Sequence, residues 1–461
     1  MTKTFLLLIV SFLILTLQSA SSSTIFQDDL KGWKAGVAKV KITPGESLWM
    51  AGYASRNHTS DGVLMDLWSK ALVIEDSKGK KGVLITNDLV KIPKSTSDRI
   101  RDRIGATYGL TRSQIILNCS HTHSGPVLYD SFSNIYPLNE DQLNKVKAYS
   151  EKFENQIVEL VGKAIGSMVP AQIFAQNGVT RFQVNRRNNA EALSNNINDL
   201  KGPNDYAVPV IKVVNKAGEI IAVAFGYACH GTVLDIYKFS GDYMGFAQFE
   251  LEKMHPGVTA LYFQGAGADQ NPLPRRTVPL AQQYGRTLAA AVERVLSEDM
   301  RNLEPVLTTA YSEIDLAFAG LPPTKEELLE IMKDSSPTPG YLKVSAKCLL
   351  QRLERGETLK NTYPYPCEVW KVGDQPIFAL GGELLVQYAI DLKKVFGPDI
   401  FVLGYTNDVM AYIPSETVLR EGGYEGTRSP IFTTSWNTNI PATILQEMSR
   451  LAEKAGVQPV K

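Results

Sequence analysis

Two histidines separated by a single residue, His121 and His123, carry the strongest chemical signal in this sequence. On an extended backbone such a pair shares one face, so both imidazoles can point into the same cavity. A pair of this kind is more often a hydrogen-bonded structural feature than a metal site. His230 and Glu383, each of which follows an apolar run of its own, favour the metal site. Imidazoles with one carboxylate suit zinc, with a coordination position open for water, and we expect a zinc site here.

Short, continuous apolar runs rich in β-branched residues precede these polar residues. The runs span residues 83–86, 115–117, 220–226, 261–263, 377–380 and 401–403. Apolar runs without alternation are typical of strands that are covered on both faces. Ligands of open α/β sheets bind beyond the carboxyl ends of the strands. We therefore expect His121, His230 and Glu383 to meet at one site.

Amphipathic stretches with helical spacing alternate with these runs. They cover residues 146–165, 278–296 and 325–332, and Thr324 with Glu327 forms a capping box before the last of them. Helices that alternate with buried strands indicate an α/β fold. The fold that we predict consists of mixed, largely buried β-sheets flanked by helices.

The composition excludes several classes of protein. The chain has 461 residues, 44% of them hydrophobic, which is too long and too apolar for a disordered segment. Its 48 basic and 48 acidic residues leave no net charge, so we expect no nucleic-acid partner. No protein partner is evident either. Four cysteines in this length are too few for a disulfide scaffold, and the sequence leaves open whether Cys348 pairs with Cys367.

The N-terminus has the three parts of a secretory signal peptide. Lys3 precedes an apolar run over residues 5–17, and small residues follow it. The run is shorter than the ~20 residues that span a membrane. We expect residues 1–22 to be removed and the protein to be secreted or periplasmic. Residues 23–461 are expected to form a single domain, with a helical insertion at about residues 321–361 that shapes access to the site.

Several segments together resemble the neutral/alkaline ceramidases. They are residues 36–43, 50–54, 68–75, 121–126, 240–247 and 424–426, which cover most of the mature chain in order. The resemblance implies zinc held by His121, His230, Glu383 and Tyr412. It also implies that His123, Arg186 and Tyr424 assist cleavage of an amide bond. The resemblance does not separate Arg186 from the neighbouring Arg187, and Tyr412 could instead be a packed aromatic residue.

Two departures from the family pattern bear on the substrate. Gln270 stands where the family has a serine, and glutamine cannot accept an acyl group. This favours attack by zinc-activated water and opens the possibility of a substrate other than ceramide. The chain ends in a helical stretch over residues 441–455, so we expect it to lack the C-terminal immunoglobulin-like domain of many family members.

The sequence thus predicts a secreted zinc-dependent amidohydrolase that cleaves the N-acyl bond of a lipid, with transient contact to a membrane surface. One alternative is a zinc hydrolase of a non-lipid amide or ester. Another is a non-catalytic, metal-containing binding protein. The predicted ligand set argues against this last interpretation, because structural zinc sites are more often closed by cysteines.

Overall fold

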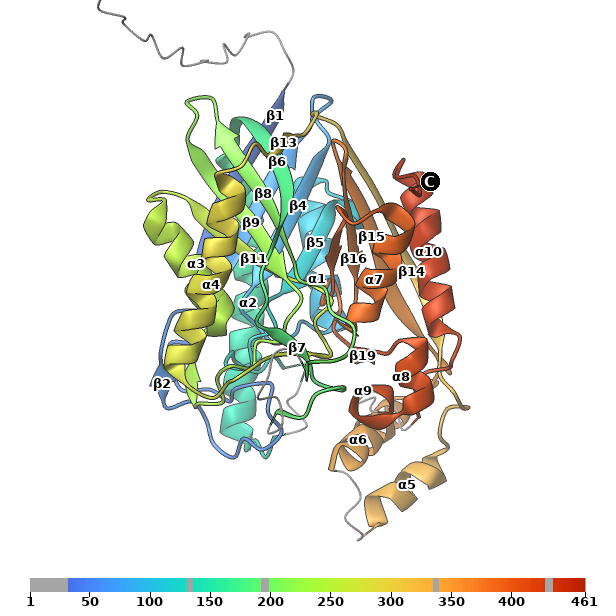
Figure 1. Ribbon diagram of the computed structural model, residues 1–461. Coiled ribbons are helices and arrows are strands. Elements are labelled where there is room, and N and C mark those ends of the chain that lie inside the picture. Colours follow the sequence, from blue (N-terminus) through green and yellow to red (C-terminus); the bar gives the residue numbers. More distant parts are fainter. Residues whose placement is uncertain are drawn as a thin grey trace, which may run out of the picture. The chain divides into compact units, whose positions relative to one another are not determined.

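Two large β-sheets form the centre of the fold (Figure 1). The computed structural model describes residues 32–129, 131, 136–191, 199–334, 340–427 and 434–460. The larger sheet has the order β11-β9-β8-β6-β1-β3-β4-β5, with β13 beside β6, and the smaller has the order β14-β15-β16-β18. Both sheets mix parallel and antiparallel neighbours: β4 with β5, β9 with β11 and β16 with β18 are parallel.

The strands of the larger sheet are β1 (Trp33–Lys41), β3 (Trp68–Glu75), β4 (Lys81–Asn87), β5 (Ile115–Cys119), β6 (Val169–Val179), β8 (Ala207–Asn215), β9 (Ile220–Tyr227), β11 (Thr259–Gln264) and β13 (Arg301–Asn302). Those of the smaller sheet are β14 (Leu307–Ala317), β15 (Thr362–Val372), β16 (Gln375–Leu380) and β18 (Phe401–Leu403). Short strands pair outside both sheets: β2 (Gly62–Val63) with β10 (Lys238–Phe239), β7 (Gln183–Asn185) with β12 (Gln270–Pro272), and β17 (Glu383–Leu384) with β19 (Tyr412–Ile413).

The helices are α1 (Lys94–Tyr108), α2 (Glu140–Gly166), α3 (Asp242–Met254), α4 (Val278–Leu296), α5 (Lys325–Lys333), α6 (Gly340–Glu354), α7 (Val386–Phe396), α8 (Glu416–Glu421), α9 (Gly423–Thr427) and α10 (Ile440–Lys454). The amphipathic stretches predicted from the sequence lie in α2, α4 and α5. The predicted capping box of α5 is present, with the side chains of Thr324 and Glu327 each bonded to the other's backbone N–H. A turn of 3-10 helix, η1 (Arg112–Gln114), leads into β5.

Apolar contacts arrange these elements in four layers. The inner faces of the two sheets share one core, in which Leu72, Ile116 and Phe263 of the larger sheet belong with Trp370 and Phe401 of the smaller. The outer face of the larger sheet is covered by α1 and α2 at one end and by α3 and α4 at the other. The outer face of the smaller sheet is covered by α7 and α10. The predicted fold class, mixed β-sheets flanked by helices, is therefore confirmed.

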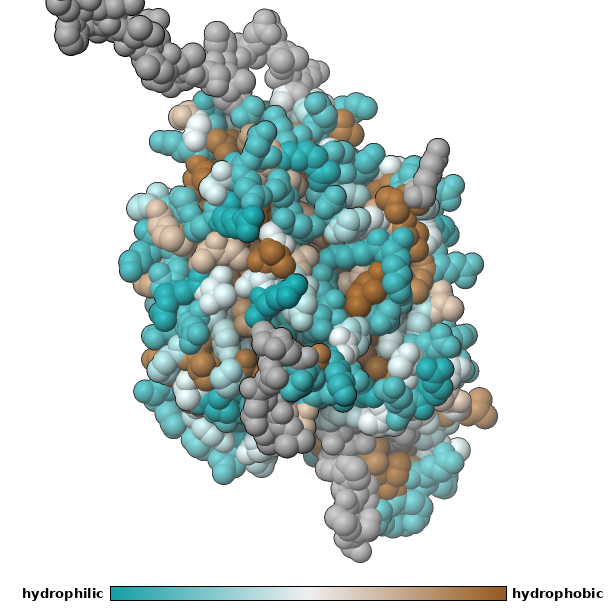
Figure 2. Space-filling model, viewed as in Figure 1, coloured by the Kyte–Doolittle hydropathy of each residue, from teal (hydrophilic) through white to brown (hydrophobic). Residues whose placement is uncertain are grey.

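Burial on both faces explains the absence of alternation in the strands. All the apolar runs predicted as strands are strands: β4, β5, β9, β11, β16 and β18. Every residue of β5 and of β11 is buried. On the side of the molecule seen in Figure 2, hydrophilic residues cover most of the surface and apolar ones are scattered among them. The apolar side chains of the sheets thus lie between the layers.

The carboxyl ends of distant strands meet at one buried side chain, Asn118. Its Oδ1 accepts a hydrogen bond from the Gln264 N–H at the end of β11 (2.8 Å), and its Nδ2 donates to the Gly404 carbonyl after β18 (2.8 Å). By hydrogen-bond connectivity β5 and β11 run in opposite senses, yet their carboxyl ends come together. Asn118 thus joins the two edge strands of the larger sheet to the end of β18.

Other expectations from the sequence concern the termini, the cysteines and the insertion. The predicted signal peptide, residues 1–22, lies outside the described residues. Within the described part of the chain, no helix combines the length and the hydropathy needed to cross a bilayer. Cys348 and Cys367 both lie in that part and are not joined by a disulfide. Residues 321–361 contain α5 and α6, whose buried residues join the core of the smaller sheet.

Candidate functional site

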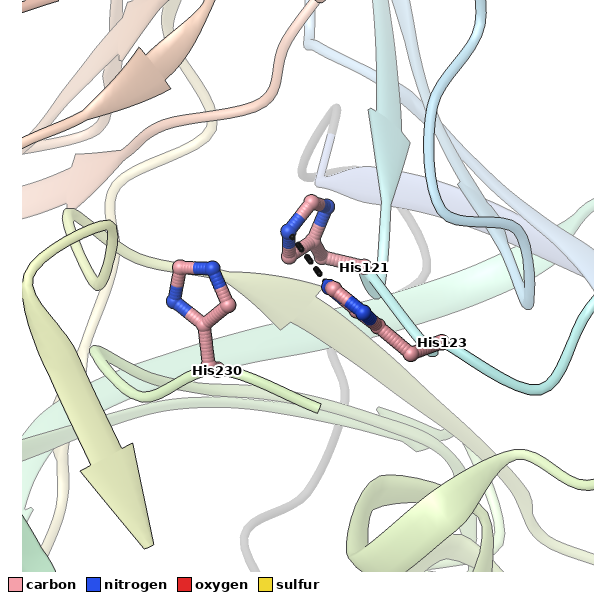
Figure 3. Close-up of side chains that lie close together, drawn as sticks. All are labelled: His121, His123 and His230. Atoms are coloured by element: carbon pink, nitrogen blue, oxygen red, sulfur yellow. Dashed lines mark hydrogen bonds between the residues drawn. The ribbon is translucent and has the colours of Figure 1, made fainter. Parts of the chain in front are cut away.

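Three histidines converge just beyond the carboxyl ends of the sheet strands: His121, His123 and His230 (Figure 3). One potential ligand atom from each lies within 4.8 Å of those of the others. His121 Nε2 is 3.2 Å from His123 Nε2, and the rings of His121 and His230 meet edge to face with centroids 4.7 Å apart. The expectation of an extended backbone is wrong at His121, whose φ of 60° lies in the left-handed region. A turn in the loop after β5, and not strand alternation, brings the pair together.

The ring nitrogens of His121 and His230 are assigned by their backbone partners. His121 Nδ1 donates to the Val90 carbonyl (2.6 Å), and His230 Nδ1 donates to the Gly267 carbonyl (2.8 Å). Because a carbonyl can only accept, each Nδ1 carries a proton, and in a neutral imidazole of this tautomer the lone pair is on Nε2. Both Nε2 atoms face the same space. Backbone carbonyls that orient imidazoles in this way are typical of the shell around metal-binding histidines.

Glu383 supplies a carboxylate to the same space. It lies in β17, and its Oε2 is 3.4 Å from His121 Nε2 and 3.6 Å from His230 Nε2. This buried oxygen makes no regular hydrogen bond with any described residue. Burial raises the pKa of Glu383, but the adjacent His121 and His230 outweigh it and hold that pKa well below its usual value.

These atoms fit a divalent cation. Two ligands about 2.0–2.1 Å from a tetrahedral ion lie about 3.3 Å apart, close to the separations of the Glu383 oxygen from the His121 and His230 nitrogens. Burial lowers the pKa of His230 to about 4, and Arg186 adds to the effect. His230 is therefore neutral and Glu383 ionised at pH 7. The group could hold a metal ion.

His123, which the resemblance implies assists amide cleavage, lies close enough to the same space to be a metal ligand. Burial lowers its pKa well below the usual value, so the ring is neutral at pH 7. Its Nδ1 is buried without a hydrogen-bond partner among the described residues. The ring packs against Tyr53, at 4.8 Å between centroids, and Arg56 donates to the His123 carbonyl (2.9 Å). These contacts fix the ring beside His121 and leave its Nε2 directed at the cluster.

Of the two neighbouring arginines after β7, Arg186 faces the histidines and Arg187 turns away. Arg186 Nη1 is 3.4 Å from His230 Nε2, and its Nη2 donates to the Tyr412 hydroxyl (3.2 Å). Its Nε donates to one oxygen of Glu425 (2.8 Å), while Arg187 Nη1 donates to the other (2.7 Å). Glu425 thus clamps both arginines to α9. The choice left open by the sequence falls on Arg186.

Tyr412 and Tyr424 lie on either side of the Arg186 guanidinium, which is 5.6 Å and 5.5 Å from their ring centroids. Tyr412 pairs with Glu383 across the parallel strands β17 and β19. Burial raises the pKa of Tyr412 well above its usual value, so its hydroxyl is protonated at pH 7. Tyr424 is 47% exposed and marks the open side of the group. All predicted site residues therefore belong to one connected cluster.

Sequence reasoning missed several residues that support the cluster. The Val90 and Gly267 carbonyls carried no signal, because every residue has a carbonyl. Glu425 was visible only as part of the segment over residues 424–426. The ring centroid of Tyr405 is 4.4 Å from that of His121. Tyr405 follows the apolar run over residues 401–403, as other predicted site residues follow runs of their own, so this pattern could have identified it.

Gln270 contacts His230 through its main chain. The side chain is fully buried, and its Nε2 donates to the Pro203 carbonyl (3.3 Å). Its main-chain carbonyl accepts a hydrogen bond from the His230 N–H (3.0 Å). The contribution of Gln270 to the site is thus made through the backbone.

Comparison with known proteins identifies the family. Residues 33–272 match the family described as neutral/alkaline non-lysosomal ceramidase, N-terminal. The chain belongs to this family. The match confirms the resemblance seen in the sequence, and it includes the three histidines and Arg186. Glu383, Tyr412 and Tyr424 lie beyond the matched residues. The roles of all the predicted site residues, inside and beyond the match, stay predictions.

Known ceramidases resemble the chain over about half of its length. Neutral ceramidase A of Dictyostelium discoideum is 26% identical over 267 residues, which is 56% of this chain and 37% of the relative. Neutral ceramidase of Pseudomonas aeruginosa is 28% identical over 240 residues, or 49% and 34% of the two chains. The matched region thus spans little more than a third of these relatives.

The fold is similar over a larger part of the chain. The crystal structure of neutral ceramidase from Pseudomonas aeruginosa superposes with a TM-score of 0.70, 19% identity, and coverage of 93% of this chain and 75% of that one. A ceramidase complexed with C2 gives the same TM-score and identity, with 93% and 76% coverage. At this identity the likeness concerns the fold.

Proposed function

We propose that this protein is a zinc-dependent amidohydrolase that cleaves the N-acyl bond of ceramide or a closely similar lipid. The observation that carries the proposal is the convergence of His121 Nε2, His230 Nε2 and Glu383 Oε2, with both Nδ1 atoms held by backbone carbonyls. Membership of the family, and relatives that are named neutral ceramidase, support the choice of substrate.

His121, His230, Glu383 and Tyr412 would hold the zinc ion in this proposal. The ion, when bound, supplies a Lewis acid and lowers the pKa of its water to about 7. Imidazole and carboxylate ligands without a thiolate suit zinc and leave a position for substrate.

The residues around the ion would move the protons and bind the substrate oxygen. His123 is neutral at pH 7 because of its burial, so it can take a proton from the attacking water and pass it to the leaving nitrogen. The oxygen of water then bonds to the acyl carbon as the C–N bond breaks. The products are a fatty acid and a free amine.

Arg186 and Tyr424 would stabilise the charge that develops on the acyl oxygen. Tyr424 lies at the open side, where a lipid headgroup can enter, and its hydroxyl can donate to the oxygen. Arg186 packs against the Tyr424 ring and is held by Glu425, so it keeps the phenol in place. The pattern of residues 1–22 supports action outside the cytoplasm, at a membrane surface that presents the lipid.

A hydrolysis screen tests the proposal. The substrates are a fluorogenic long-chain ceramide, short N-acyl amino acids and simple esters, each with and without a chelator. We expect turnover of the ceramide that the chelator removes and zinc restores. Turnover of only the small amides or esters would mean that the substrate is not a lipid. No turnover of any substrate by the zinc-bound protein would indicate a non-catalytic protein. His255→Ala, a change at the end of α3 away from the cluster, serves as the matched control for His121→Ala.

A further inference from the structure

Tyr405 is a buried phenol whose hydroxyl has no partner among the described residues. The residue is 0% exposed and lies just after β18. A tyrosine hydroxyl in the interior normally finds a hydrogen-bond partner, because burying it unpaired is unfavourable. A donor in this state points to a partner that is not part of the protein.

The position of Tyr405 ties it to the candidate metal cluster. Its ring centroid is 4.4 Å from that of His121 and 6.4 Å from that of His230. Its N–H donates to the Gly382 carbonyl next to Glu383 (3.0 Å), and its carbonyl accepts from the Cys119 N–H (3.3 Å). Tyr405 thus bridges the loops that carry His121 and Glu383.

The backbone of Tyr405 is strained. Its φ of 52° lies in the left-handed region, where a bulky aromatic residue is rare. Strain of this kind persists where the surrounding contacts hold the residue in the unfavourable conformation, and such residues are concentrated at functional sites. Here the two backbone hydrogen bonds on either side fix the residue against the His121 ring.

A second atom of the cluster lacks a conventional partner in the same way. Glu383 Oε2 accepts no regular hydrogen bond from a described residue, and Glu383 is the charge that acts most strongly on Tyr405. We propose that the Tyr405 hydroxyl donates a hydrogen bond to an oxygen atom bound at the histidine–Glu383 cluster. That oxygen belongs to water in the resting protein and to the acyl group or carboxylate product in turnover. This inference rests on the proposed function for the identity of the acyl group.

Tyr405→Phe removes only the hydroxyl and keeps the ring against His121. Tyr149→Phe is the matched control, because Tyr149 is also buried but its hydroxyl donates to the Ile42 carbonyl (2.7 Å), away from the cluster. In chelator-treated protein, we expect Tyr149→Phe to lower the melting temperature by roughly 2 °C. Tyr405→Phe should leave it unchanged or raise it, because no protein hydrogen bond is lost.

Ligand binding supplies the second readout. In zinc-loaded protein, acetohydroxamate, a small ligand that presents oxygen atoms to a metal, should bind about tenfold more weakly to Tyr405→Phe, with the zinc content unchanged. Its affinity for Tyr149→Phe should equal that for the unmodified protein. Turnover of ceramide should fall about tenfold in Tyr405→Phe.

The outcomes separate this inference from the proposed function. If the unmodified protein hydrolyses no ceramide, the proposed function fails, while melting and acetohydroxamate binding still decide the role of Tyr405. If Tyr405→Phe melts lower, as Tyr149→Phe does, and binds acetohydroxamate unchanged, the hydroxyl has a partner within the protein and the inference is overturned. The melting readout requires neither metal nor substrate.

Discussion

Protonation of His230 couples the stability of the metal-free protein to pH. Burial, reinforced by the charge of Arg186, lowers the pKa of His230 from the usual 6.5 to about 4. The unfolded chain therefore binds a proton at this residue more readily than the folded one. Where the unfolded state binds more protons, the free energy of unfolding falls as the pH falls. The contribution of His230 is complete above about pH 6.5 and is lost toward about pH 4.

The size of the effect follows from the pKa difference. One unit corresponds to about 1.4 kcal/mol, so His230 alone should remove roughly 2 to 3 kcal/mol between about pH 7.5 and about pH 4.5. The assay is urea unfolding of chelator-treated protein across this range. In His230→Gln, the free energy of unfolding should fall by that much less over this pH range than in the unmodified protein. This holds whatever the stability of the variant at neutral pH. Tyr149→Phe, a buried change that removes no group titrating in this range, should leave the slope unchanged.

Parallel curves for the unmodified protein and His230→Gln would refute the reasoning. They would mean that His230 takes up its proton as easily in the folded chain as in the unfolded one. Burial and the nearby Arg186 guanidinium would then not exclude the charged imidazole. The same result would mean that His230 Nε2 is protonated at mildly acidic pH and cannot bind a cation there.

Substitutions at the cluster give further predictions. His121→Ala and Glu383→Ala should each abolish zinc retention and hydrolysis, because each removes a ligand; elemental analysis with stoichiometric zinc in both variants would contradict the assignment. Gln270→Ala should lower kcat/KM far less than His230→Ala, since its side chain bonds to the Pro203 carbonyl; comparable losses in a rate assay would show a direct role. Glu425→Gln should lower kcat about tenfold with unchanged zinc content, because one charge-assisted hydrogen bond to an arginine is lost; an unchanged kcat would mean that Glu425 does not hold Arg186.

Local sequence patterns were sufficient to predict helices and strands of the fold. The stretch over residues 278–296 coincides with α4, whose Thr277 side chain caps the first turn by accepting from the Leu280 N–H. The capping box of α5 acts within a few residues and formed as predicted. Strands such as β5 and β11 were recognisable because burial on both faces leaves no polar alternation. These features depend on residues that are close in the sequence, so they can be predicted from the sequence alone.

The direction of the strands depended on more than local sequence. The runs before His121 and before Gly265 form the two edge strands of the larger sheet, β5 and β11, and their carboxyl ends meet only in the folded chain. Asn118, whose side chain joins these ends, directly follows the apolar run over residues 115–117. A side chain with partners 146 and 286 residues away gives no local signal of them.

The sequence by itself determined the elements, the family and the residue types available for chemistry at His121, His230 and Glu383. Only the tertiary structure decided which atoms meet: the left-handed turn at His121, the carbonyls that set both tautomers, and the choice of Arg186 over Arg187. The physical reason is that helices and strands depend on interactions between near neighbours. The distances around a metal-sized space depend on side chains that come together only when the sheets twist and pack.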